Sequence, residues 1–245
     1  MLGLPEHVRA GLFDMDGVLT RTATVHAAAW KQMFDEFLQA REGPTFRPFD
    51  AVEDYQKYVD GKPRHDGVRD FLASRAVNLP DGSPDDDPSQ MTNCGLGNRK
   101  NVLLHQVIEE HGVEVYEGSV RYLEAARNAG LRRIVVSSSA NTEEVLRAAR
   151  LSELVEGRID GQTLATHHLK GKPAPDGFLA GASLAGVRPG EAAVFEDSLA
   201  GVEAGRNGGF GYVVGVDRLG QRQALLEHGA DVVFGDLSEL LGEGQ

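Results

Sequence analysis

Two carboxylates separated by one residue, Asp14 and Asp16, lie where a short apolar segment ends just before Gly17. The segment over residues 8–13 is too short for a helix, which indicates a buried strand of a parallel sheet. Ligands bind at the carboxyl ends of such strands. Side chains two apart on a strand face the same way, so both acids would face one site, about 7 Å apart at their Cα atoms. One acid could attack a substrate while the other transfers a proton.

Acids at this spacing also occur on solvated loops. Asp85 and Asp87 repeat it within a segment rich in proline and aspartate, where no chemistry is expected. The pair at residues 14 and 16 therefore needs support from elsewhere in the chain.

A hydroxyl-rich turn follows a second apolar segment, over residues 134–136. Ser137, Ser138 and Ser139 stand there before a helix that Asn141 could cap, with Glu144 three positions further on. Hydroxyls and free backbone N–H groups at the start of a helix suit a phosphate. A plain capping turn is the alternative.

Lys172 lies between Gly171 and Pro173, which fix the local backbone and exclude an ordinary helical face. A rigidly placed ammonium suits the point charge of a phosphate. The alternative is an ordinary surface lysine.

A second acidic pair, Glu196 and Asp197, ends the apolar segment over residues 192–195. Together with Asp14, these acids would form an all-oxygen site for Mg²⁺, which prefers hard ligands in octahedral geometry. By themselves they could equally cap the helix that follows.

Apolar strands alternate with helical patterns from residue 113 onward, which predicts a parallel sheet with helices on both faces. The strand near residues 8–13 belongs to the same sheet. The expected strands are 133–137, 192–196, 212–216 and 231–234, and the expected helices are 119–129, 142–150, 178–185, 199–207 and 219–228. The fold class is therefore α/β: a Rossmann-like, doubly wound parallel sheet core.

The pattern changes between residues 25 and 112, where helical segments are expected at 25–40, 49–59, 67–75 and 100–111 and no strand is evident. We interpret this part as an inserted helical cap domain, with residues 1–24 and 113–245 forming the core. The segment 79–98 is rich in proline, aspartate, glycine and serine, and is expected to be a mobile or surface-draped loop.

Composition limits the kind of partner. The 245 residues are 41% apolar, enough for one good core and a smaller domain. A net charge of −12 disfavours nucleic acid and anionic membrane surfaces, so an anionic substrate must be held by local cations. The single cysteine, Cys94, cannot form an internal disulfide, and neither a membrane span nor a signal sequence is evident. We expect a cytoplasmic monomer.

Taken together, the acid pair, hydroxyl turn, lysine and second acid pair resemble the four signatures of the haloacid dehalogenase superfamily of phosphotransferases. The resemblance covers nearly the whole chain. It implies that Asp14 is a nucleophile that becomes an aspartyl phosphate and that Asp16 is the general acid/base. It also implies that Ser137 and Lys172 hold the transferring phosphate. Mg²⁺ would be bound by Asp14, the Asp16 carbonyl, Glu196 and Asp197.

The helical segment narrows the resemblance to the β-phosphoglucomutase-like subfamily. The residues concerned lie on the first cap helix, in the Tyr58–Arg64 segment and around Lys100 before the last cap helix. They imply a sugar-phosphate site that comprises Thr22, His26, Trp30, Gly61, Arg64, Lys100, Ser139 and Asn141. On an amphipathic helix, His26 could equally be packed or face solvent.

Similarity to this subfamily implies interconversion of β-glucose 1-phosphate and glucose 6-phosphate through glucose 1,6-bisphosphate. A Mg²⁺-dependent sugar-phosphate phosphatase would use the same four signatures and is the alternative. A non-catalytic phosphosugar-binding module would be expected to lack Asp14 or Asp16, and both are present.

Overall fold

The computed structural model describes residues 2–242 and divides the chain into two compact units. One unit extends to Arg21 and resumes at Val113, and the other comprises Thr22–Gly112. The helical unit therefore interrupts the first unit in the sequence. The first boundary lies after residue 21, whereas the sequence analysis places it after residue 24.

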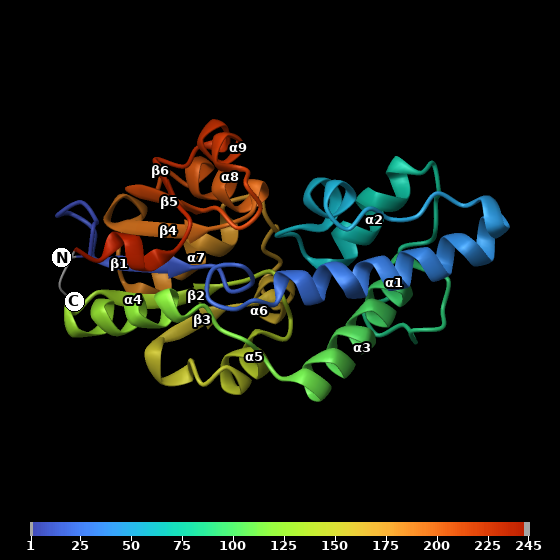
Figure 1. The fold of residues 1–245 in the computed structure, drawn as a ribbon, viewed down its shortest axis with the longest axis horizontal. Coiled ribbons are helices and arrows are strands. Elements are labelled where there is room, and N and C mark those ends of the chain that lie inside the picture. Colours follow the sequence, from blue (N-terminus) through green and yellow to red (C-terminus); the bar gives the residue numbers. More distant parts are fainter. Residues whose placement is uncertain (1, 243–245) are drawn as a thin grey trace. The chain divides into compact units, whose positions relative to one another are not determined.

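A six-stranded parallel sheet forms the centre of the first unit, in the order β3-β2-β1-β4-β5-β6 (Figure 1). The chain builds outward from β1 to β3 on one side and then returns to place β4 next to β1. The carboxyl ends of β1 and β4 thus lie at the switch point of the sheet, where ligands bind in such folds. The predicted α/β class with a doubly wound parallel sheet is confirmed. The strands are β1 (Ala10–Phe13), β2 (Arg132–Val136), β3 (Gly157–Ile159), β4 (Ala192–Glu196), β5 (Tyr212–Val216) and β6 (Val232–Phe234).

Helices cover both faces of this sheet because alternate strand residues point to opposite sides. On one face Leu12 packs in an apolar cluster with Phe178 of α7. On the other face Phe13 stacks on Phe195 with ring centroids 4.4 Å apart and meets Tyr122 of α4 edge-on at 6.2 Å. The α-helices of this unit are α4 (Glu117–Asn128), α5 (Thr142–Ala148), α6 (Gly161–Thr166), α7 (Asp176–Ala185), α8 (Leu199–Asn207) and α9 (Arg222–His228).

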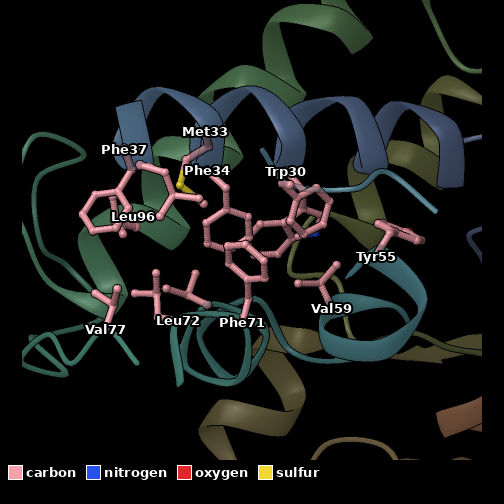
Figure 2. Packing of buried hydrophobic residues seen from close by; sticks show 13 residues of the cluster. Trp30, Met33, Phe34, Phe37, Tyr55, Val59, Phe71, Leu72, Val77 and Leu96 are labelled. Carbon is pink, nitrogen blue, oxygen red and sulfur yellow. The ribbon is translucent and has the colours of Figure 1, made fainter. Parts of the chain in front are cut away.

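The second unit is helical, and residues 22–112, all of them described, contain no strand. It comprises α1 (Ala23–Glu42), a π-helical turn (Tyr55–Val59), α2 (Arg64–Ser74) and α3 (Asn93–His111). Apolar residues of α1 recur every three or four positions and form one buried face. Figure 2 shows this face, where Phe34 stacks on Trp30 at 5.3 Å and contacts Phe71 at 4.1 Å. Within residues 2–242, no helix is both long and apolar enough to cross a membrane.

The expectation for residues 79–98 is wrong in part, because the last cap helix begins at Asn93 rather than near residue 100. Thr92 caps this helix by accepting a hydrogen bond from the Gly95 amide at 2.9 Å. The preceding loop is held to the helix, since the Asn98 side-chain amide donates to the carbonyls of Pro84 and Asp86 at 2.9 and 2.8 Å. Gly95 and Gly97, in the first two turns, obscure the helical pattern in the sequence.

The sequence analysis also missed β3 and α6, which lie between α5 and α7. The strand is three residues long, Gly157–Ile159, and contains a glycine and an arginine, so no apolar segment marks it. The helix α6 spans a single short segment capped by Asp160, whose side chain accepts from the Thr163 amide at 2.8 Å. The strand β3 pairs with β2 and forms the edge of the sheet on that side.

Candidate active site

A buried lysine lies between two acids at the switch point of the sheet. Asp14 follows β1, where its amide donates to the Phe195 carbonyl at 2.9 Å, and Glu196 ends β4. The Lys172 ammonium donates to Asp14 Oδ1 and to Glu196 Oε1. All three side chains are less than a tenth exposed. Asp14 and Glu196 lie 158 and 24 positions from Lys172 in the sequence, and both accept a hydrogen bond from its Nζ atom.

Burial and charge oppose each other at this lysine. Burial alone would lower the pKa of the Lys172 ammonium, but the Asp14 and Glu196 carboxylates outweigh it and hold the pKa above its usual value. The ring of Phe178 lies under the ammonium at 5.1 Å, a favourable cation–π distance. Lys172 is therefore a permanent positive charge, suited to an anionic group.

Asp14 is a carboxyl whose ionisation depends on its neighbours. Burial raises its pKa well above the usual value, and Glu196 and Asp16 add to the rise. The Lys172 ammonium acts in the opposite direction. The positive charge of Lys172 therefore favours the carboxylate form of Asp14.

The turn after Asp14 carries Asp16 away from the strand. Because β1 ends at Phe13, Asp16 is placed by this turn and not by the alternation of a continuing strand. Gly17 has a left-handed backbone, with φ of 84°, and its amide donates to the Thr20 carbonyl at 2.8 Å. Asp16 is half-buried and close enough to Asp14 to raise its pKa.

Gly17 also brings this turn against the second acidic loop. A Cβ atom at Gly17 would lie 1.7 Å from Asp197 Oδ2, so only glycine permits the approach. Glu196 is tied to the same loop, because its Oε2 accepts from the Ser198 amide at 2.8 Å and from its hydroxyl at 2.9 Å. Ser198, which the sequence analysis did not select, in turn caps α8 through the Gly201 amide at 3.1 Å.

The hydroxyl-rich turn after β2 has a different local structure from the one predicted. Ser137 Oγ accepts from the Ser139 amide at 3.1 Å, and Ser139 Oγ accepts from the Asn141 amide at 3.2 Å. The Asn141 side chain makes no capping hydrogen bond at α5, so that prediction is wrong. The Thr142 hydroxyl instead donates to the Ser139 carbonyl at 2.8 Å. Serine side chains here organise the backbone of the turn.

Ser137 and Lys172 line one small pocket. It lies between Ser137–Ser138 and Lys170–Lys172, with Phe178 and Gly177 of α7 in its wall. This hollow links the hydroxyl-rich turn to the Lys172 segment. The structure thus brings together Asp14, Ser137, Lys172 and Glu196, which belong to separate motifs in the sequence.

The oxygen donors around Asp14 fit Mg²⁺ in their chemistry. Asp14, Asp197 and the Asp16 carbonyl are hard ligands of the kind this ion takes. Within residues 2–242 no three acidic, histidine or cysteine side chains are arranged to hold a metal by themselves. Mg²⁺ usually takes one or two carboxylates and completes its shell with water and substrate phosphate, so such an arrangement is not required. Both oxygens of Glu196 have protein partners, which hold its carboxylate in place beside Asp14 and Ser198.

In the helical unit, three of the predicted residues form a cluster of their own. Lys100 Nζ lies 2.9 Å from His26 Nδ1 and 5.0 Å from the centre of the Trp30 ring. Lys100 is buried within α3. The prediction that it precedes the last cap helix is therefore wrong. Thr22 is buried at the start of α1, where its carbonyl accepts from the His26 amide at 2.8 Å.

The remaining two predicted residues, Gly61 and Arg64, lie after the π-helical turn and at the start of α2. Gly61 has a left-handed backbone, with φ of 69°. Arg64 begins α2, and its Nε donates to Nε2 of His65 at 3.2 Å. His65 was not selected from the sequence, where nothing beyond its position next to Arg64 marks it. Burial lowers the pKa of Arg64. Burial also lowers the pKa of His65, and the positive charge of Arg64 lowers it further.

Comparison with known proteins shows similarity over almost the whole chain. The model of the haloacid dehalogenase-like hydrolases matches residues 8–209. A β-phosphoglucomutase of Mycobacterium tuberculosis is 57% identical over 247 residues, which cover 98% of this chain and 94% of that protein. A phosphorylated carbohydrates phosphatase of Thermotoga maritima is 26% identical and covers 91% of this chain and 92% of its own.

A solved structure shares the fold. That of β-phosphoglucomutase from Clostridium difficile aligns with a TM-score of 0.77 at 22% identity. The alignment covers 96% of this chain and 94% of that one. The similarity includes both the sheet and the helical segment.

Proposed function

The chain belongs to the haloacid dehalogenase-like hydrolase family, and on that basis we propose that it is a β-phosphoglucomutase. The observation that carries the proposal is the 57% identity over nearly the full chain to a protein of that name. The contacts of Lys172 with Asp14 and Glu196 support the phosphotransferase chemistry that this activity needs. The reaction interconverts β-glucose 1-phosphate and glucose 6-phosphate.

Asp14 is the nucleophile in this proposal. One oxygen of its carboxylate attacks the phosphorus atom of glucose 1,6-bisphosphate in line with the sugar oxygen that leaves. A bond forms between Asp14 and phosphorus, and the bond from phosphorus to the sugar oxygen breaks. Lys172 and Ser137 hold the phosphoryl oxygens while charge shifts between them.

Asp16 moves the proton. Its carboxyl protonates the departing sugar oxygen and becomes a carboxylate. In the opposite direction, the carboxylate takes the proton of the 6-hydroxyl of β-glucose 1-phosphate as that oxygen attacks the phosphorus atom on Asp14. The bisphosphate forms, reorients and returns its 1-phosphate to Asp14, and glucose 6-phosphate leaves. The phosphoenzyme and Asp16 are then ready for the next turnover.

Mg²⁺, when bound, would neutralise charge on the phosphoryl group. We propose that Asp14, Asp197 and the Asp16 carbonyl hold it, with Glu196 supporting the site through Lys172 and Ser198. The oxygen-only donor set supports this assignment.

The residues proposed to bind the sugar and its second phosphate are those that the resemblance to the subfamily implies. The proposed binding residues are Thr22, His26, Trp30, Gly61, Arg64, Lys100, Ser139 and Asn141. Supporting this, His26, Trp30 and Lys100 form one cluster that has a buried ammonium. A buried cation in a chain of net charge −12 is suited to an anionic substrate. A cytoplasmic location and a monomeric state stay predictions.

A sugar-phosphate phosphatase is the second candidate. The 26% identical relative from Thermotoga maritima bears the name of such an enzyme and spans most of the chain. The same phospho-Asp14 is hydrolysed if water, rather than a sugar hydroxyl, attacks it.

The fate of the phosphoenzyme separates the two candidates. The protein is mixed with Mg²⁺ and glucose 1,6-bisphosphate, quenched in acid, and the phosphorylated peptide is located by mass spectrometry. We expect phosphate on Asp14, faster discharge when β-glucose 1-phosphate is added than in buffer, and no phosphopeptide from Asp14→Asn. Phosphate on another residue would refute the nucleophile. Equal discharge with and without the sugar would favour the phosphatase.

A further inference from the structure

A short loop between β5 and α9 touches both acidic turns of the site. It comprises Asp217–Gln221, and Asp217 Oδ1 orders it by accepting from the amides of Leu219 at 3.2 Å and Gln221 at 2.8 Å. The helix α9 begins at Arg222, three residues later than the sequence predicts, because this loop precedes it. None of its residues has a part in the chemistry described above.

Arg218 of this loop reaches the turn that follows Asp16. Its Nε donates to the Gly17 carbonyl at 2.7 Å, and one of its terminal nitrogens lies 3.5 Å from the Val18 carbonyl. The other terminal nitrogen donates to the Gly235 carbonyl at 2.6 Å. Arg218 thereby ties the Asp16 turn to the loop after β6.

The guanidinium is held in place. Its central carbon lies 3.4 Å from the centre of the Tyr116 ring, and the side chain is 12% exposed. A planar guanidinium with fixed donors suits simultaneous contacts of this kind, which a lysine does not reproduce. The position of the Gly17 carbonyl is therefore fixed by a rigid group and not by solvent.

The same loop also contacts the second acidic turn. The Gln221 side-chain amide donates to the Asp197 carbonyl at 3.0 Å. Gly17, bound by Arg218, is the residue that leaves no room for a Cβ atom against the Asp197 carboxylate. The Asp217–Gln221 loop thus holds the backbone of both Gly17 and Asp197, where the two acidic turns approach each other most closely.

We propose that Arg218 is a positioning residue for phosphoryl transfer, which fixes the Asp16 turn from the Asp217–Gln221 loop. The Asp16 carbonyl belongs to the peptide group whose N–H, that of Gly17, donates to Thr20. The next peptide group is the one that Arg218 binds through the Gly17 carbonyl. With both groups held, Gly17 has one backbone conformation, and the Asp16 carbonyl one orientation. The inference rests on the proposed function, in which Asp16 protonates the leaving oxygen.

The dependence of rate on the leaving group tests this role. Single-turnover phosphorylation of Asp14 is measured with enzyme in excess, using glucose 1,6-bisphosphate and 4-nitrophenyl phosphate. A sugar oxygen needs a proton to leave, whereas nitrophenolate does not. For Arg218→Met we expect a rate about 10–100-fold lower with the bisphosphate, in the range for lost supporting contacts. With the nitrophenyl ester we expect a loss within about threefold.

Matched variants separate positioning from folding. Arg222→Met removes an arginine bond to the Val233 carbonyl near the same loop, and we expect unchanged rates with both substrates. Arg218→Lys keeps the positive charge but not the planar set of N–H donors. Its rate should therefore also fall more with the bisphosphate than with the nitrophenyl ester, but by a smaller factor than in Arg218→Met. It also serves as the test if Arg218→Met does not fold.

Asp16→Asn is measured in the same assay and should show the leaving-group preference in full. If it does and the Arg218 variants slow both substrates equally, the positioning role is refuted while the proposed function stands. If Asp16→Asn itself slows both substrates equally, Asp16 is not the acid, and the inference falls with that assignment.

Discussion

Replacing the lysine at the centre of the site should destabilise the protein in a pH-dependent way. Lys172→Met removes the ammonium that Asp14 and Glu196 share, and all three side chains are less than a tenth exposed. Removing one partner of a buried ion pair typically costs about 3–5 kcal/mol, because the remaining charge is stranded. We expect a loss of this size in the free energy of unfolding at pH 8.

The sign of the pH dependence follows from Asp14. Burial already raises its pKa, and Lys172 opposes that rise, so the variant raises the folded-state pKa further above the unfolded value of about 3.9. The folded variant then binds more protons than the unfolded chain between these two values. Its stability therefore increases as the pH falls through the folded pKa. In the wild type, Lys172 stays charged between pH 5.5 and pH 8 because its pKa is raised, so its own contribution does not change over that range.

Urea unfolding followed by far-ultraviolet circular dichroism measures this, with a chelator present at pH 5.5 and pH 8. The Lys172→Met loss should be smaller at pH 5.5 than at pH 8. The double variant Lys172→Met/Glu196→Gln should be more stable than Lys172→Met, since one stranded charge is gone. A loss below about 1 kcal/mol at pH 8, or an equal loss at both pH values, would refute the reasoning.

Three further changes test other parts of the account. Asp16→Asn should slow turnover of the sugar phosphate by about 10²–10⁴-fold, the usual contribution of a general acid, and an unchanged steady-state rate would remove Asp16 from that role. Gly17→Ala places a Cβ atom 1.7 Å from Asp197 in a left-handed conformation, so unfolding should become easier by about 1–2 kcal/mol and turnover should fall. Wild-type stability and rate in that variant would show that the turn adapts. In the helical unit, Phe34→Ala should lower the free energy of unfolding by about 3–5 kcal/mol. Unfolding can be followed by the fluorescence of the single tryptophan, Trp30, on which Phe34 stacks. A cost below about 1 kcal/mol would mean that the cluster collapses around the vacated space.

The sheet could be predicted because its strands are apolar on both faces. The segments that become β1, β2 and β4 each contain a short apolar run that is followed by polar residues of the site. Since parallel strands present their carboxyl ends at one edge, placing the motifs at strand ends was enough to bring Asp14 and Glu196 together. Lys172, which follows no strand, was selected only by its backbone setting.

Most parts that could not be predicted depend on contacts between distant residues, and the turn at Asn141 depends on which of several neighbouring side chains makes the hydrogen bonds. The strand β3 has no apolar run of its own and exists because it pairs with β2. Asn141 has the sequence of a helix cap, but the Ser139 hydroxyl and the Thr142 side chain organise that turn instead. Arg218 has no motif, and its contact with Gly17 spans 201 positions. Local patterns contain no signal for such contacts.

The ratio of products from one substrate distinguishes a mutase from a phosphatase. β-Glucose 1-phosphate is supplied with Mg²⁺ and a trace of glucose 1,6-bisphosphate, and glucose 6-phosphate and inorganic phosphate are measured in the same sample. A mutase gives glucose 6-phosphate in large excess over released phosphate, which is the result we predict. Release of phosphate with little glucose 6-phosphate would contradict the account and identify a phosphatase.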